Sequence, residues 1–155
     1  MQVLSMIIGS AIVFNGLLAG ISIDASLVKL PARRRIGNIA YAAFARGNDL
    51  GNGIIVYSSL AVLAALLVFI ATLTAFLQDK KSSLLLLLIG ASFTTIIHFL
   101  GTAKAAPIML SIKNTPDEEA VLKKKFDQFE KWNGIRACFQ LITFILLISC
   151  FILNR

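Results

Sequence analysis

Charged residues are scarce in this chain. Only 15% of its 155 residues are Asp, Glu, Lys or Arg, whereas 57% are hydrophobic. A soluble domain of this size carries about 25% charged residues. The composition therefore excludes an ordinary soluble domain and indicates an integral membrane protein, with enough chain for one compact domain.

Residues that bind metals or carry redox chemistry are also few. The chain has one histidine, His98, and two cysteines, Cys138 and Cys150, which lie 12 positions apart on one apolar segment. That spacing is neither a CxxC pair nor a zinc motif, and it argues against a thiol–disulfide oxidoreductase. We expect both thiols to be buried and to fill space. A single histidine cannot build a haem or two-metal site alone, so no metal and no cofactor are expected.

Four long apolar runs account for most of the chain. As helices, they are long enough to cross a hydrocarbon core of about 30 Å. They predict an all-α fold, a four-helix transmembrane bundle that forms a single domain over residues 1–155. Gly16 and Gly20, among other small residues of the first run, predict a face for close helix packing. The expected spans are 3–23, 54–77, 84–112 and 134–153.

The two long connections carry helical patterns of their own. In residues 25–53, Ile36, Ile39 and Phe44 recur at helical spacing and predict an amphipathic loop helix at the cytoplasmic membrane surface. The triple arginine at 33–35 is expected to set topology and to contact lipid headgroups. In the second connection, Thr115 is expected to cap a long helix that continues into the fourth span.

Basic residues are concentrated in these two connections and the adjoining helix ends, which hold 12 of the 15 Lys and Arg. The positive-inside rule then places both connections in the cytoplasm and both termini outside. We expect a multi-pass protein of the cytoplasmic (inner) membrane, with the lipid bilayer as its partner. Long apolar runs separate the basic residues, so the net charge of +7 does not indicate a nucleic-acid partner. Protein partners stay open.

A few polar residues interrupt the cytoplasmic half of the spans. Ionisable residues inside a membrane usually face the bundle interior and mark functional sites. We therefore expect a cavity that opens to the cytoplasm and binds a lipophilic small molecule. His98 is the candidate catalytic base. The candidate substrate-binding residues are Asn15, Trp132, Asn133 and Arg136.

The same residues also admit a purely structural interpretation. Asn15 would hydrogen-bond a neighbouring helix, Arg136 would snorkel to phosphate headgroups, and His98 would bond one backbone carbonyl. Two classes of function follow. One is a small membrane oxidoreductase acting on a lipophilic aromatic molecule, and the other is a non-enzymatic component, such as a lipid-binding or complex-assembly subunit. A cavity beside the third and fourth helices discriminates between them.

Three sequence features resemble the anthrone-oxygenase-like family of small four-helix membrane proteins. They are the run Gly16-Leu17-Leu18-Ala19-Gly20, Pro107 near the end of the third span, and Trp132-Asn133 followed by Arg136. The Trp-Asn-x-x-Arg stretch is the most specific of them. The resemblance implies the four-helix fold. Characterised fungal members oxidise anthrones to anthraquinones with molecular oxygen and no evident metal or flavin. Where the family often has Pro-x-Asn, this chain has Met109 in place of the asparagine.

Overall fold

The computed structural model describes residues 2–154, which form helices joined by short turns. Two short helices, α2 and α3, separate the first two of the four long ones. Wide π-helical turns at Ala25–Lys29 and Asn48–Asn52 precede α2 and α4, and a 3-10 turn at Ile112–Asn114 follows α5. The helices are α1 (Gln2–Asp24), α2 (Leu30–Ile36), α3 (Asn38–Gly47), α4 (Gly53–Leu77), α5 (Ser82–Ser111) and α6 (Glu119–Leu153).

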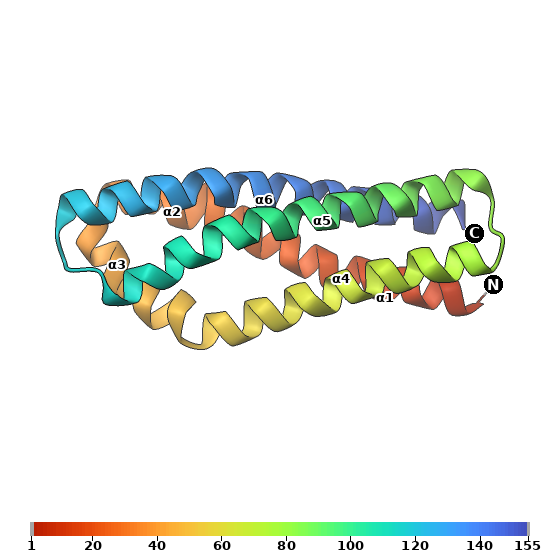
Figure 1. Ribbon diagram of the computed structural model, residues 1–155, viewed down its shortest axis with the longest axis horizontal. Coiled ribbons are helices and arrows are strands. Elements are labelled where there is room, and N and C mark those ends of the chain that lie inside the picture. Colours follow the sequence, from red (N-terminus) through yellow and green to blue (C-terminus); the bar gives the residue numbers. More distant parts are fainter. Residues whose placement is uncertain (1, 155) are drawn as a thin grey trace.

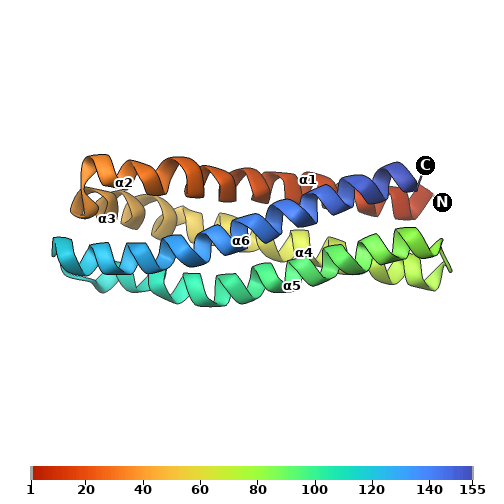
Figure 2. The same cartoon turned by 90° about the horizontal axis from the view of Figure 1, so that it is seen from above.

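The four long helices run side by side in one elongated bundle (Figure 1). Both chain ends and the α4–α5 turn lie at one end of it, which we call the terminal end. The helices α2 and α3 and the α5–α6 connection lie at the other, the loop end (Figures 1 and 2). Four helical stretches are long and apolar enough to cross a membrane. The all-α four-helix transmembrane bundle predicted from the sequence is therefore confirmed.

Buried apolar side chains form two clusters along the bundle. The cluster at the terminal end joins all four long helices around Leu4 and Leu88. The cluster at the loop end packs α3 against α5 and α6 around Tyr41 and Phe126. Buried polar side chains occupy positions between the two clusters on α1, α5 and α6. They include Asn15, Ser22, Thr94, His98, Asn133, Gln140 and Thr143.

The predicted small-residue face of α1 makes one close contact with α6. A Cβ atom at Gly16 would lie 2.9 Å from Cε2 of Phe144, which is closer than real Cβ contacts allow. At Gly20, such an atom would meet nothing within 4 Å. The expectation of close packing is therefore confirmed at Gly16 and wrong at Gly20, which faces open space.

The helix α6 begins later than predicted. It starts at Glu119 and no side chain caps it. The Thr115 hydroxyl cannot act as the expected cap, because it donates to the Ser111 carbonyl and accepts a hydrogen bond from Lys125 Nζ. The predicted cap at Thr115 is therefore wrong. From Glu119 the helix continues without interruption to Leu153, as predicted.

The first connection contains two short helices instead of one. The helix α3 covers most of the predicted amphipathic segment. Its Ile39 and Phe44 side chains are exposed, as expected for a face directed at the membrane surface. Tyr41 and Ala45, on its other side, are buried in the loop-end cluster. The connection is thus part of the folded bundle and not only a surface segment.

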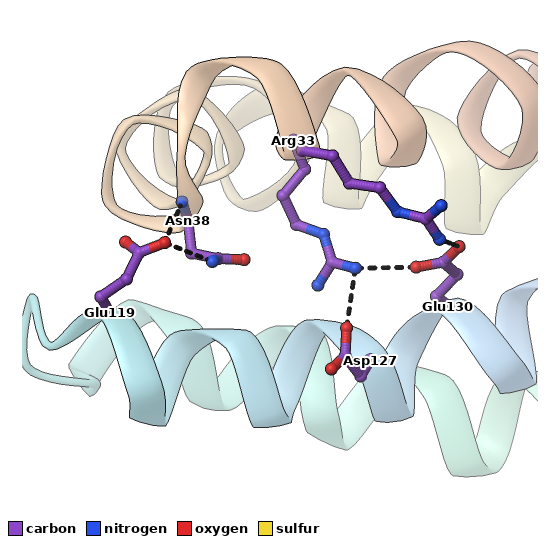
Figure 3. A network of polar contacts seen from close by, with 6 residues as sticks. Arg33, Asn38, Glu119, Asp127 and Glu130 are labelled. Carbon is purple, nitrogen blue, oxygen red and sulfur yellow. Dashed lines mark hydrogen bonds and ion pairs between the residues drawn. The ribbon is translucent and has the colours of Figure 1, made fainter.

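Ion pairs hold α2 against α6 (Figure 3). The Arg33 guanidinium lies 2.8 Å from a carboxylate oxygen of both Asp127 and Glu130, and its side chain is only 4% exposed. Arg34 also pairs with Glu130, at 3.1 Å. The expectation that the triple arginine contacts lipid headgroups is therefore wrong for Arg33, because acidic residues of α6 neutralise its charge within the protein.

Further polar contacts tie α3 to the start of α6 and to the connection before it. The Glu119 carboxylate accepts hydrogen bonds from the backbone and side-chain nitrogens of Asn38 (Figure 3). Arg46 pairs with Asp117 at 2.8 Å and donates to the Thr115 carbonyl at 2.7 Å. The loop end is therefore held together by polar contacts between the two connections.

The two cysteines differ in their surroundings. Cys150 is buried in the terminal-end cluster, as expected. Cys138 is exposed on α6, so the expectation that both thiols are buried is wrong for this residue. The neighbouring position, Ala137, takes the buried side of the helix, and Cys138 is rotated outward by about 100°.

Candidate ligand cavity

A cavity of about 340 Å³ lies in the loop half of the bundle. All four long helices and both π turns contribute to its wall, which is largely apolar. This volume lies within the usual range for ligand pockets of about 300–1,000 Å³. The polar side chains on the wall include Ser22, Lys29, Asp49, His98, Asn133 and Arg136.

A series of hydrogen bonds positions Arg136 on this wall. Its Nε donates to Asn133 Oδ1 at 2.9 Å, and Asn133 Nδ2 donates to Ser26 Oγ at 2.8 Å. The Ser26 hydroxyl donates in turn to the carbonyl of Ser22. These bonds tie α6 to the end of α1 and fix the guanidinium. Among residues 2–154, the two terminal nitrogens of Arg136 have no hydrogen-bond partner and its guanidinium has no ion pair.

His98 lies on the same wall and contacts the backbone beside Arg136. Its Nδ1 lies 3.1 Å from the Arg136 carbonyl oxygen. A carbonyl oxygen only accepts hydrogen bonds, so Nδ1 carries the hydrogen and Nε2 of the neutral ring keeps its lone pair. Nε2 has no hydrogen-bond partner in the described part of the chain. The contact to a backbone carbonyl expected in the structural interpretation is present, yet it leaves one ring nitrogen available.

Two residues of the wall escaped the sequence interpretation. Ser22 is 1% exposed, and its Oγ has no hydrogen-bond partner among the described residues. A serine in an apolar span gives no signal that separates it from a packing residue. Asp49 accepts a hydrogen bond from Asn48 Nδ2 at 2.9 Å. The sequence could have pointed to Asp49, because it is the only acidic residue in the basic connection 25–53.

Two of the candidate substrate-binding residues, Asn15 and Trp132, are not among the residues that line the cavity. Asn15 is buried, donates to the Ala11 carbonyl at 2.8 Å and accepts from Gln140 at 2.8 Å. This is the helix-to-helix hydrogen bond of the structural interpretation. Trp132 packs, partly buried, against the loop-end cluster. The structure therefore brings His98, Asn133 and Arg136 together on the wall, and Asn15 and Trp132 do not line it.

The cavity wall carries a charged group and hydrogen-bonding groups that can contact a ligand. Across residues 2–154, no group of three or more His, Cys, Asp or Glu is placed to hold a metal ion. The cavity instead combines a cation, Arg136, a ring nitrogen with a lone pair, on His98, and a free hydroxyl, on Ser22. Such a set can bind a carbonyl or anionic group and can accept a proton next to it.

The chain matches no protein-family model, no curated protein and no solved structure. The resemblance to the anthrone-oxygenase-like family therefore stays a hypothesis that depends on the motif residues. Of the Trp-Asn-x-x-Arg stretch, Asn133 and Arg136 line the cavity and hydrogen-bond one another.

Proposed function

We propose that this protein binds a lipophilic small molecule whose polar end contacts Arg136 inside the cavity. The observation that carries the proposal is the unsatisfied guanidinium. Asn133 holds Arg136 through Nε alone, and the guanidinium has no ion pair among the described residues. Asp49 on the same wall attracts it only from beyond ion-pair distance. Arg136 is half-buried, and a charge partly removed from water is stabilised by a partner, because desolvation is costly. A bound carbonyl or anionic group would supply that partner, and the largely apolar wall would contact the rest of the molecule.

Mass spectrometry of the purified protein tests this proposal. The protein would be extracted from native membranes with its surrounding lipid, and retained small molecules would be identified. We expect one compound at stoichiometric amounts in the unaltered chain and its loss in Arg136→Gln. Lys131→Gln, an exposed position on the same helix, is the matched control and should retain the compound. Equal retention in the two variants would contradict the proposal.

A second candidate function is oxidation of a bound lipophilic aromatic molecule, as the family resemblance implies. The observation that favours it is the available Nε2 of His98 on the same wall as Arg136. His98 would remove a proton from a ring CH2 group, and Arg136 would stabilise the resulting anion. Molecular oxygen would then add one oxygen atom to this carbon as a ketone, and its second oxygen atom would leave as water with the two hydrogens. His98→Ala should then abolish oxygen consumption while the molecule stays bound. Unchanged oxygen consumption in this variant would contradict His98 as the base. No oxygen consumption by the unaltered chain would favour the non-enzymatic alternative, a lipid-binding or complex-assembly subunit.

We also propose that the loop end faces the cytoplasm, with both termini on the outer side of the cytoplasmic membrane. The bundle supports this arrangement because the two basic connections share one end of it (Figure 1). Their positive charge then satisfies the positive-inside rule.

A further inference from the structure

The residues that line the cavity differ, from helix to helix, in how much of their surface is exposed. On α1 and α6, lining residues such as Ser22, Phe129 and Asn133 are buried. The exposed lining residues are Ile54 and Ser58 on α4 and Leu110 on α5. Ile54 is 40% exposed and Leu110 is 51% exposed. The mouth of the cavity therefore lies between the first half of α4 and the last turns of α5.

The first half of α4 has an inward face that packs on little protein. No residue in the segment 54–63, which the structure describes completely, is buried, and burial along this helix resumes at Ala64. The lining residues Ile54, Tyr57, Ser58 and Ala61 recur at the spacing of one helical face. In Figure 2, the ribbons of α4 and α5 diverge toward the loop end. The cavity thus occupies the place where α4 would otherwise contact the bundle.

We propose that the cavity is entered sideways from the lipid bilayer, between α4 and α5, and that its occupant is an anionic membrane amphiphile with an acyl-type tail. This inference rests on the proposed function and specifies its ligand class. Ile54 and Leu110 lie at the loop-end limits of α4 and α5. In a bilayer spanned by these helices, acyl chains would meet headgroups near this depth. An opening at this depth admits a molecule already dissolved in the membrane, in contrast to the opening to the cytoplasm expected from the sequence.

The charges on the wall favour a negative head group. Arg136 and Lys29 are positive, and Asp49 is the single carboxylate among the lining residues. Lys29 already pairs with Asp24 at 3.3 Å, whereas Arg136 has no such partner in residues 2–154. The buried and unpartnered Ser22 hydroxyl adds a hydrogen-bond donor for the same head group. A carboxylate or phosphate monoester has the matching acceptors.

Photolabelling in vesicles tests both parts of this inference. The full chain would be reconstituted in phosphatidylcholine vesicles containing palmitic acid with a mid-chain diazirine, and the labelled residues mapped by mass spectrometry. The matched probe is the corresponding fatty alcohol, which has the same tail and no charge. We expect the acid to label the inward face of α4 and the wall of α5, with at least about tenfold preference over the alcohol. Arg136→Gln should remove this preference.

Ser58→Trp and Ser59→Trp test the route of entry. The two serines are adjacent and exposed, and only Ser58 is a lining residue. Cavity labelling should fall about tenfold in Ser58→Trp and stay unchanged in Ser59→Trp. Equal labelling in the two variants would overturn sideways entry, and equal labelling by acid and alcohol would overturn the anionic class; both results leave the proposed function standing. Absence of any label on the cavity wall with either probe would overturn the proposed function as well.

Discussion

Gln140 donates a hydrogen bond of 2.8 Å to Asn15 Oδ1, and both side chains are about 1% exposed between α6 and α1. Two amides that satisfy each other inside an apolar bundle act as a helix-to-helix contact. Asn15 thus has a structural role in a part of the bundle where the sequence predicted a ligand contact.

A double-mutant cycle on this pair should show coupling. Asn15→Leu and Gln140→Leu each remove the amide-to-amide hydrogen bond, so the double variant should be less destabilised than the sum of the single variants. We expect a coupling energy of about 0.6–1.7 kcal/mol, measured by unfolding in detergent. Ligand occupancy should be unchanged in Asn15→Leu. Additive single effects would show that the amides do not interact.

Removing the Arg33 side chain should destabilise the loop end. Arg33→Ala leaves the carboxylates of Asp127 and Glu130 without their buried partner, but both retain some contact with water. We expect a loss of about 1–3 kcal/mol in the free energy of unfolding. Arg35→Ala, at an exposed position with no ion pair among the described residues, should change it by less than about 0.5 kcal/mol. Similar losses in both variants would contradict this role for Arg33.

Gly53 marks the point where α4 leaves the π turn Asn48–Asn52. A Cβ atom there would lie 2.6 Å from the Asn48 carbonyl oxygen, and a backbone atom cannot easily move away. Gly53→Ala should therefore cost about 1–3 kcal/mol. At Gly47 nothing lies within 4 Å of such an atom, so Gly47→Ala should be neutral or stabilising by up to about 1 kcal/mol. Thermal unfolding of the two variants provides the comparison.

Cysteine labelling tests the proposed orientation. Ser82 and Asn114 lie at opposite ends of the α5 region, and each would be replaced by Cys in a chain lacking Cys138 and Cys150. An impermeant maleimide added to intact cells should label Ser82→Cys and should label Asn114→Cys only after permeabilisation. The reverse pattern would place the loop end outside.

Much of the fold could be predicted because long apolar runs strongly constrain helix number and length. Contacts between charged residues that lie far apart in the sequence could not be predicted. Nothing local indicates that Arg33 pairs with Asp127, which lies 94 positions away, and a run of arginines is equally compatible with a lipid surface. The prediction of where α6 starts failed for a related reason. The Thr115 hydroxyl hydrogen-bonds with Ser111 and Lys125 and does not cap the helix.

Some residues of the candidate site could likewise be predicted from the sequence, and others could not. His98, Asn133 and Arg136 were identifiable because polar groups inside an apolar span are few. Ser22 was not, because its place on the wall depends on how α1 rotates against α6. Asn15 had the same sequence signal as the wall residues, and only the position of Gln140 distinguishes its environment from theirs.

The π turn at Ala25–Lys29 determines which face of α2 is turned toward α6. The Leu30 amide donates to the Ala25 carbonyl, five positions back, so this turn holds an extra residue. Each residue of a helix adds about 100° of rotation. Deleting one residue within 25–29 would therefore swing Arg33 off the surface of α6, although no contacting side chain had changed. The π turn should therefore tolerate substitutions far better than insertions or deletions. A change in its length is what would separate α2 from α6.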